Sequence, residues 1–270
     1  MSTHLRGASA TSLDAVLAAV EASGGVPDEL GGQLFGVVGA LDGAPALRRV
    51  LTDPSTEAPA KQGLVASVFG RAVSAETLAV VQTAVAGRWS GGRDLADGLE
   101  TAGVVALVKA ASAAGTLDTV ESELFDVAQV VAGAAELRSA LSDPVAPVSA
   151  KAELIGSLLS GKAQPVTETI VRQAARARSK SFERTLNDFA DLVADRRGRL
   201  LAEVRTAKPL PAAESVRLAA ALSTKYGRPV HLNVIVDPSV IGGLSVSVAD
   251  DVIDGTMSSR LEAARRRLAG

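Results

Sequence analysis

The strongest constraint on this fold is an internal repeat with an offset of 90 residues. The stretch LRRVLTDPSTEAPAKQGLVASV, which begins at Leu47, realigns without a gap on LRSALSDPVAPVSAKAELIGSL, which begins at Leu137. The same offset relates positions further upstream, for example Gly25 with Gly115. Copies of this length indicate a duplicated domain, because the units of a solenoid are shorter and more numerous.

Each copy has the pattern of a helical bundle. In the first copy, apolar residues recur at helical spacing between Leu13 and Val20 and again between Leu30 and Leu41. Glycines follow both stripes, and an Asp-Pro pair breaks a third helical stretch. The pattern predicts about six helices in each copy, a plausible closed bundle of roughly 90 residues. One helix could join the copies, since no proline lies between Asp94 and Val120.

From Leu200 onward the pattern is that of a small α/β unit. Residues 200–207 predict a strand, and Ala212 to Tyr226 predicts a helix that ends at Gly227. Two further stretches, 230–236 and 244–248, alternate in part between apolar and polar residues and predict strands. A final amphipathic helix is expected after Asp254 or Thr256, either of which can cap it.

These patterns predict a mainly α fold with two tandem six-helix bundles and a small α/β C-terminal domain. The expected domains are residues 1–98, 99–197 and 198–270.

Composition excludes several classes of function. The chain has no cysteine, which excludes disulfides, thiol catalysis and thiolate metal sites. Its two histidines, His4 and His231, have no partner at ligand spacing, so neither a metal nor another cofactor is expected. The net charge of −2 does not favour nucleic-acid binding. No apolar run approaches the roughly 18 residues that span a bilayer, so we expect a soluble, intracellular chain without direct membrane insertion.

One segment imitates a phosphate-binding loop. Gly156 to Lys162 has the glycine and lysine spacing of that motif, but Ala163 stands where a magnesium-binding Ser or Thr is needed. The preceding residues are helical in pattern, whereas the true motif follows a strand. We therefore interpret Gly161 as the end of a helix. No Ser/His/Asp set is present, and the cluster of Asp250, Asp251 and Asp254 fits turns and caps, so no catalytic residue is expected.

Residues 229–262, PVHLNVIVDPSVIGGLSVSVADDVIDGTMSSRLE, carry the most specific motif of the chain. An apolar run ends in Asp237-Pro238, the pair Gly242-Gly243 precedes an alternating stretch, and Asp254-Gly255 precedes the last helical pattern. This order closely resembles the C-terminal signature of the delta subunit of F-type ATP synthases, the oligomycin-sensitivity-conferring protein of mitochondria. The chain from about Val104 onward resembles the whole family chain, and the residues before it look like an extra bundle. We expect the signature to be mainly structural, with the paired glycines at positive φ or at a close backbone approach.

The resemblance implies a non-catalytic subunit of the peripheral stalk, held at the cytoplasmic face of the cell membrane as part of the synthase. Such a subunit links the alpha and beta subunits of the catalytic head to the b subunit and resists the torque of the rotor. In the family, the first and fifth helices of the bundle form a groove for an amphipathic helix from the N-terminus of an alpha subunit, a recognition mode that needs an apolar seam.

Both copies offer such a seam. In the first copy it comprises Val16, Leu17, Val20, Leu78, Val81 and Val85. In the second copy it comprises Val104, Leu107, Val108, Ile170 and Val171. Burial of either seam in its own core is an equal alternative, and we favour the first copy slightly as the docking site.

A basic row follows the second seam. Its members lie four residues apart and would line one face of a helix: Arg172, Arg176, Lys180 and Arg184. They form either a solvated face or a docking stripe for an acidic partner. Trp89, beside glycine-rich sequence, is expected to be a packing anchor.

Two other functions are compatible with the helical pattern alone. One is a generic helical scaffold or adaptor unrelated to ATP synthase, and the other is a helical hydrolase or transferase. The scarcity of His, Cys and aromatic residues argues against the enzyme, and residues 229–262 argue against both.

We predict that the purified protein neither binds nor hydrolyses ATP, because the apparent phosphate loop lacks the required strand and hydroxyl. Isothermal titration with ATP and magnesium should give no saturable heat for the wild type or for Lys162→Ala. Saturable binding that disappears in Lys162→Ala would contradict this interpretation.

Overall fold

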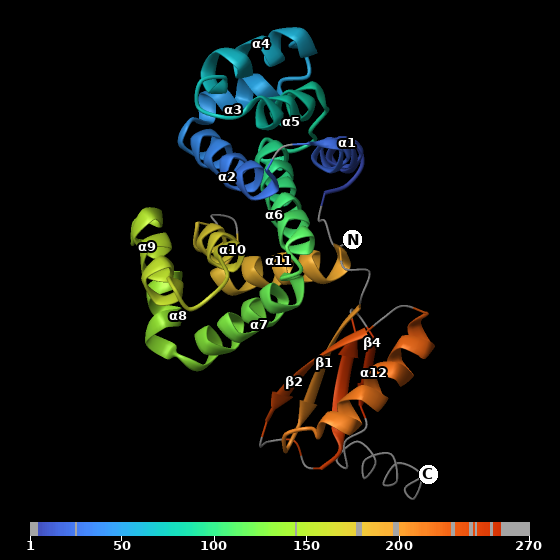
Figure 1. Cartoon of the computed structure of the whole chain (residues 1–270). Coiled ribbons are helices and arrows are strands. Elements are labelled where there is room, and N and C mark those ends of the chain that lie inside the picture. Colours follow the sequence, from blue (N-terminus) through green and yellow to red (C-terminus); the bar gives the residue numbers. More distant parts are fainter. Residues whose placement is uncertain are drawn as a thin grey trace, which may run out of the picture. The chain divides into compact units, whose positions relative to one another are not determined.

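The computed structural model describes residues 5–24, 26–143, 145–176, 180–196, 200–227, 230–237, 240, 242–248 and 251–254. The chain divides into two compact units, Met1–Val193 and Ala194–Gly270, which are described separately. The described residues form twelve helices and four strands (Figure 1). The expected class, mainly helical with a small sheet, is confirmed.

The first unit is built from helices. Their bounds are α1 Ala8–Ala22, α2 Pro27–Gly43, α3 Pro45–Thr52, α4 Ala58–Phe69, α5 Ala75–Ala86, α6 Asp94–Ala113, α7 Leu117–Gly133, α8 Ala135–Ser142, α9 Val148–Leu159, α10 Pro165–Ala175 and α11 Phe182–Arg196. Proline occupies the first turn of α2, α3, α4 and α10, where its missing N–H costs no hydrogen bond.

The helices follow the sequence repeat. The first residues of α2, α3, α4 and α5 lie 90 positions before those of α7, α8, α9 and α10. One tertiary hydrogen bond recurs as well. The side-chain Oε1 of Gln33 accepts the Ser74 N–H at 2.7 Å, and the carboxylate of Glu123 accepts the Gln164 N–H at 2.9 Å. Equivalent sequence thus produces equivalent helices and an equivalent contact between them.

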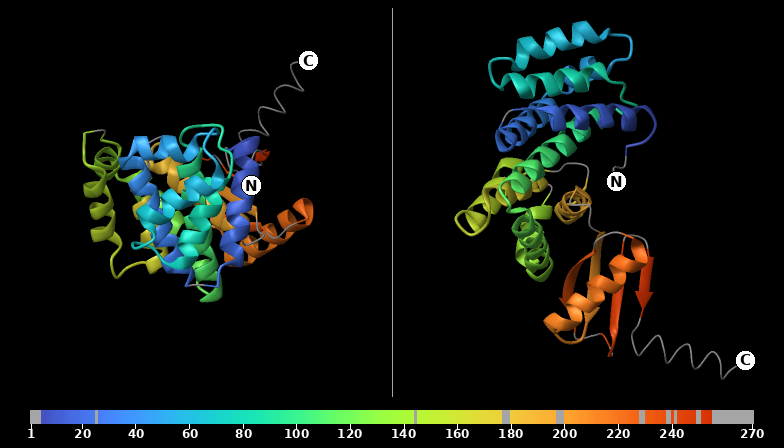
Figure 2. Two further views of the ribbon diagram at one scale, coloured as in Figure 1. Left: turned by 90° about the horizontal axis from the view of Figure 1, so that it is seen from above. Right: turned by 45° about the vertical axis from the view of Figure 1, so that its right-hand side comes forward.

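Helix α6 belongs to both halves of the first unit. It is one uninterrupted helix of 20 residues, as the lack of a proline between Asp94 and Val120 allowed. It passes through residues 98 and 99, where we expected the boundary between two bundles. Its residues Leu95, Leu99 and Val105 enter the first core, with α1, α2 and α5 around them. Leu107 and Val108 enter the second core, formed with α7 to α11. Figures 1 and 2 show α6, in green, running from one set of helices to the other.

The most extensive contact between helices in the unit is the crossing of α2 and α6. A Cβ added at Gly31 would lie 2.6 Å from Cγ of Leu107 and 2.9 Å from the carbonyl oxygen of Gly103. A Cβ at Gly103 would in turn meet the ring of Phe35. Both glycines therefore allow backbones to approach to a distance that any larger residue would prevent. Phe35, on α2, is buried in the second core and ties the first half to it.

The second unit is a four-stranded sheet with one helix. Its elements are β1 Leu200–Thr206, α12 Ala212–Tyr226, β2 Val230–Val236, β3 Leu244–Val248 and β4 Asp251–Asp254. The strand order is β2-β1-β3-β4. Strands β1 and β2 are parallel and joined through α12, while β3 runs antiparallel to β1 and β4. The core is small and includes Ala202, Val204, Leu222 and Val246.

The signature residues take structural positions where they are described. The Asp237 N–H donates to the carbonyl of Thr206 at 2.9 Å, directly after β2. Gly242 and Gly243 have φ of 66° and 79°, a left-handed conformation that favours glycine, as expected from the sequence. Pro238, Gly255 and the expected last helix lie outside the described residues.

Strand β4 was not anticipated. We expected Asp251 and Asp254 to serve turns and caps, and they begin and end a strand that pairs with β3. The helix that Asp254 was expected to cap lies outside the described residues. The Asp251 carboxylate accepts a hydrogen bond from the Tyr226 hydroxyl at 2.6 Å and pairs with Lys225 at 3.2 Å. The strand was missed because four residues with acidic ends carry too little periodicity to indicate one.

Replacing Gly31 by alanine should destabilise the protein by about 1–3 kcal/mol, because the added methyl group overlaps Leu107 and the backbone of α6. Gly32→Ala is the matched control on the same helix, since a Cβ there meets nothing within 4 Å. It should be neutral or stabilising by roughly 0.5–1 kcal/mol. Urea unfolding followed by circular dichroism measures both, and equal stability of the two variants would contradict the close crossing.

Candidate functional site

The seam of the first half lies largely in its core. Helices α1 and α5 pack against each other, and Val16, Val20, Val81 and Val85 are buried between them and α6. Leu17 is also buried, whereas Leu78 is only partly buried and reaches the surface. A docked helix could therefore contact Leu78 directly, while the other five residues are buried beneath it in the core.

The seam of the second half is more deeply covered. Its five side chains belong to the second core, and none is more than 4% exposed: Val104, Leu107, Val108, Ile170 and Val171. These residues hold α6 and α10 together, so a partner could not contact them without opening the fold.

The prediction of a basic row along one helix was wrong. Helix α10 ends at Ala175, and a separate helix, α11, begins at Phe182. The Ser181 hydroxyl accepts the N–H of Arg184 at 3.3 Å, so this serine caps a new helix. The four cations therefore lie on two helices and the connection between them, and they do not share one helix face.

Two of these four cations are already paired. Arg172 forms an ion pair with Glu168 one turn earlier, at 2.6 Å, and its guanidinium lies over Gly156 of α9. Lys180 forms an ion pair with Asp188 of α11. Arg176 and Arg184 are exposed on either side of the connection. Of the four, these two residues are exposed, whereas Arg172 and Lys180 are half-buried and each has a carboxylate partner.

The segment that imitates a phosphate-binding loop is part of a helix. Gly156 lies inside α9, and Gly161 follows the end of that helix with φ of 70°. This is the C-terminal glycine expected from the sequence. Helical backbone at Gly156 cannot form the loop that would wrap a phosphate.

Trp89 is a packing anchor, as predicted. It is 8% exposed, and its indole N–H donates to the carbonyl of Ala84 at 2.8 Å. Its ring lies against Gly98 of α6, where a Cβ would come within 2.6 Å of the ring. Because Gly98 has no side chain, the indole ring of Trp89 can pack directly against the backbone of α6.

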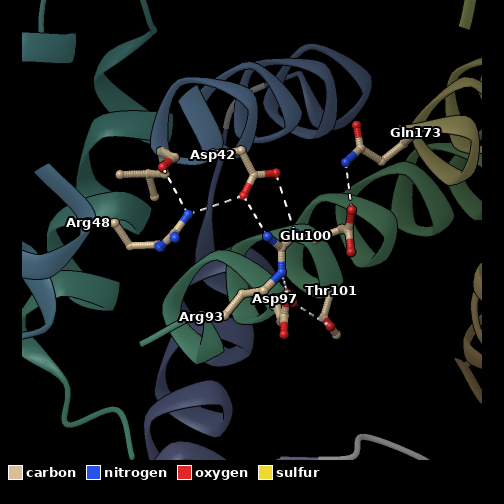
Figure 3. Close-up of polar contacts among 8 residues, drawn as sticks. Asp42, Arg48, Arg93, Asp97, Glu100, Thr101 and Gln173 are labelled. Atoms are coloured by element: carbon tan, nitrogen blue, oxygen red, sulfur yellow. Dashed lines mark hydrogen bonds and ion pairs between the residues drawn. The ribbon is translucent and has the colours of Figure 1, made fainter. Parts of the chain in front are cut away.

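A polar cluster at the start of α6 was not found from the sequence (Figure 3). The Asp42 carboxylate, at the end of α2, forms ion pairs with Arg93 at 2.9 Å and with Arg48 at 3.5 Å. Arg93 also pairs with Asp97 one turn along α6, at 3.2 Å. Desolvation by burial raises the pKa of Asp97, while Arg93 opposes that rise. The cluster holds the first turn of α6 against the C-terminal end of α2 and against α3.

Glu100 continues this cluster toward α10. Its Oε1 accepts a hydrogen bond from Nε2 of Gln173 at 2.6 Å, so it links α6 to α10 (Figure 3). Burial raises the pKa of Glu100 to about 7, assisted by the nearby charge of Asp97 and opposed by the Gln173 hydrogen bond. The sequence offered no signal for this site, because a glutamate on a helix is usually solvated and only tertiary packing covers it.

The sequence of this chain is similar to those of one subunit of the ATP synthases. The family profile described as ATP synthase delta (OSCP) subunit matches residues 104–268. The ATP synthase subunit delta of Streptomyces griseus is 47% identical over 243 residues, covering 90% of each chain. The protein of the same name from Kineococcus radiotolerans is 46% identical and covers 96% of this chain and 93% of its own. The protein of the same name from Nocardioides sp. is 45% identical, and the alignment covers 99% of this chain and 98% of that protein.

These matches differ in extent. The family profile begins at residue 104, within α6, whereas the relative from Nocardioides sp. aligns with nearly the whole chain. The residues that form the helices before α6 thus align with such relatives and lie outside the profile match.

Stability should depend on pH through Glu100. Its folded pKa is raised from 4.5 to about 7, so folding takes up a proton and stability falls as the pH rises from 4.5 to 7. Glu100→Gln keeps an acceptor for Gln173 without a charge, so it should flatten this slope and gain on the order of 2 kcal/mol above pH 7. Urea unfolding at pH 5, 6, 7 and 8 measures the effect. Glu153→Gln, at an exposed position on α9, is the control, and an unchanged slope in Glu100→Gln would contradict the assignment.

Proposed function

The chain belongs to the ATP synthase delta (OSCP) subunit family, and we propose that it joins the alpha and beta subunits of the catalytic head to the b subunit of the peripheral stalk. As a member of this family it is a non-catalytic, peripheral-stalk subunit of the F-type ATP synthase. The observation that carries the proposal is identity of 45% over nearly the whole length of a subunit delta. This relationship argues against an unrelated helical scaffold and against a hydrolase or transferase.

The task of such a subunit is mechanical. Rotor torque reaches the head, and the stalk must hold the head still so that rotation drives ATP synthesis. A joint under torque must transmit force without flexing inside itself. The uninterrupted α6, the glycine crossing with α2 and the Glu100–Gln173 bond all resist movement between the two halves of the first unit. These contacts support the proposal of a stiff connector.

We further infer that the first unit arose from two six-helix bundles that share α6. The first comprises α1 to α6 and the second α6 to α11, close to the expected ranges 1–98 and 99–197. The repeated helix starts and the repeated Gln33 and Glu123 contacts support this inference. Residues 8–22 of α1 correspond, at the same offset, to residues 98–112 within α6. Residues 198–270 would then be the separate α/β domain.

We assign the first unit to the catalytic head and the second unit to the b subunit. The surface over the seam of α1 and α5 would receive the N-terminal helix of an alpha subunit, with Leu78 as its direct contact and the exposed Arg176 and Arg184 as a separate basic surface. The complex would hold this chain at the cytoplasmic face of the cell membrane. Among the described residues, every helix is too short or too polar to cross a membrane.

Binding measurements with purified partners test this proposal. The full chain should bind both the catalytic head prepared without this subunit and the water-soluble part of the b subunit, and it should hold them in one ternary complex. Leu78→Asp should weaken head binding about tenfold, which corresponds to ~1.4 kcal/mol, and leave b binding unchanged. Val50→Asp, an exposed apolar position on α3, is the matched control. A chain that binds neither partner would overturn the proposed function.

A further inference from the structure

The first half of the first unit contains a pocket that is lined by both polar and apolar residues. Its volume is about 450 Å³, which lies within the range of small-molecule sites. The lining comes from the end of α3, the loop that follows it, the start of α4 and the connection from α5 to α6, with Ala8 of α1 beside them. The six residues of the α1–α5 seam take no part in this lining, so the pocket is a separate feature.

A buried lysine without a partner lines this pocket. Lys61, near the start of α4, is only 6% exposed. Its ammonium has no hydrogen bond or ion pair with any residue that the structure describes. It is also not one of the completely covered polar atoms that lack a hydrogen bond, so it contacts the open space of the pocket. An ammonium that is removed from bulk water and left unpaired costs free energy, and an anion in the pocket would offset this cost.

Two acidic residues precede Lys61 in the sequence, and neither pairs with it. The Asp53 carboxylate accepts hydrogen bonds from the N–H and the hydroxyl of Ser55, at 2.8 and 2.7 Å. Glu57 lines the pocket, but it is exposed and forms no ion pair with Lys61. The described part of the fold therefore leaves the buried charge of Lys61 without a direct counter-ion.

Three other groups of the lining suit an anion. The N–H of Ala58 begins α4, where the helix dipole favours negative charge, and it has no hydrogen bond within the described residues. Thr56 is half-buried, and its hydroxyl has no partner in the same part of the chain. Arg88 is exposed at the edge of the pocket and forms no ion pair with a described residue. A ligand that carries oxygen atoms would thus meet hydrogen-bond donors as well as a positive charge.

The wall formed by residues 86–90 is held in place by α1. The Ser12 hydroxyl donates to the Arg88 carbonyl at 2.7 Å and accepts the Arg88 N–H at 2.9 Å. The Ser9 hydroxyl accepts the Ser90 N–H at 2.8 Å. A wall that is fixed before binding lowers the entropy cost of holding a ligand.

The charge and the shape of the lining favour a carboxylate. Lys61 supplies one full positive charge away from water, and the nearby Glu57 would repel a second negative charge, which disfavours a phosphate dianion. Ala58, Ala86 and the ring of Trp89 are apolar parts of the lining. A ligand that fills the pocket therefore needs a small apolar body beside its charged group.

We propose that this pocket binds a carboxylate attached to a small apolar body, with Lys61 as its counter-ion. The Ala58 N–H and the Thr56 hydroxyl would donate to the carboxylate oxygens, and Trp89 would pack against the apolar body. A free organic acid and an acidic side chain of another subunit both offer this chemistry. The site goes beyond the function proposed above and does not depend on it.

The tryptophan makes this site observable. Trp89 is the one tryptophan of the chain, and it lines the pocket, so its fluorescence reports on binding. Titration of the full chain with sodium butyrate at constant ionic strength should give a saturable change in its emission. Butyramide has nearly the same shape without the charge, and it should bind at least tenfold more weakly. Sodium phosphate should also bind at least tenfold more weakly than butyrate.

A matched pair of variants tests the role of Lys61. Lys61→Met removes the charge and keeps a side chain of similar length, so it should weaken butyrate binding at least tenfold. Lys151→Met makes the same change at the equivalent, half-buried position of the second half, and it should change butyrate binding less than twofold. Butyrate should raise the Tm of the wild type and of Lys151→Met but not that of Lys61→Met. Thr56→Val keeps the shape of the threonine without its hydroxyl, and its several-fold weaker binding tests the site even if Lys61→Met does not fold.

The source of the carboxylate is identified in a second step. Butyrate is titrated again with the catalytic head and the b subunit present. Loss of butyrate binding, together with weaker assembly of Lys61→Met, identifies an acidic side chain of another subunit as the ligand. Unchanged butyrate binding and normal assembly of Lys61→Met identify a free organic acid.

Three results would overturn the proposal. They are the absence of a saturable response to butyrate, equal butyrate affinity of the wild type and Lys61→Met, and binding of phosphate or butyramide as tight as that of butyrate. Because the first titration needs no partner, its failure leaves the proposed function untouched. A failure of the chain to bind the head or the b subunit would likewise leave the pocket proposal intact.

Discussion

Helices α2 and α6 can approach each other closely only because Gly31 and Gly103 lack side chains at their crossing. Leu107 and Phe35 fill the space on either side of it, so the contact is both narrow and fully packed. Helix α6 contributes to both cores of the first unit, and Phe35 crosses from the first half into the second core. The position of one half relative to the other is therefore set by this crossing. A shared helix also leaves no linker at which the halves could bend.

Polar contacts reinforce the same junction. Asp42 with Arg93 fixes the start of α6 to the end of α2, and Glu100 with Gln173 fixes its middle to α10. Half-buried charges contribute little net stability, but they restrict geometry because a misplaced partner leaves a desolvated charge. The apolar crossing and the polar junction together make the unit stiff, and stiffness is what a stator subunit requires.

The two halves have the same helices but differ in the side chains on their surfaces. Both halves retain the same helix starts and the same contact from α2 or α7 to the following turn. They differ in the volume and charge of a few side chains, such as Phe69 against Leu159 and Gly36 against Asp126. Local structure tolerates these changes, since neither helix propensity nor capping depends on them strongly. The surface of each half is affected much more, because a methyl group or a charge changes what can bind there.

Sequence alone determined the repeat, the helical class of each copy, the bounds of α12, β2 and β3, and the family, since apolar periodicity, prolines, terminal glycines and the motif around Gly242 and Gly243 are local signals. It also identified Trp89 as an anchor. The lack of a proline between Asp94 and Val120 also predicted that one helix could join the copies, and α6 is that helix. Only tertiary structure decided that the seam residues are mostly buried, that a helix break divides the basic row and that Glu100 is covered by α10. Each of these depends on contacts between residues far apart in the chain. Burial is a property of the assembled surface, and one stripe of apolar residues looks the same in a sequence whether it faces a core or a partner.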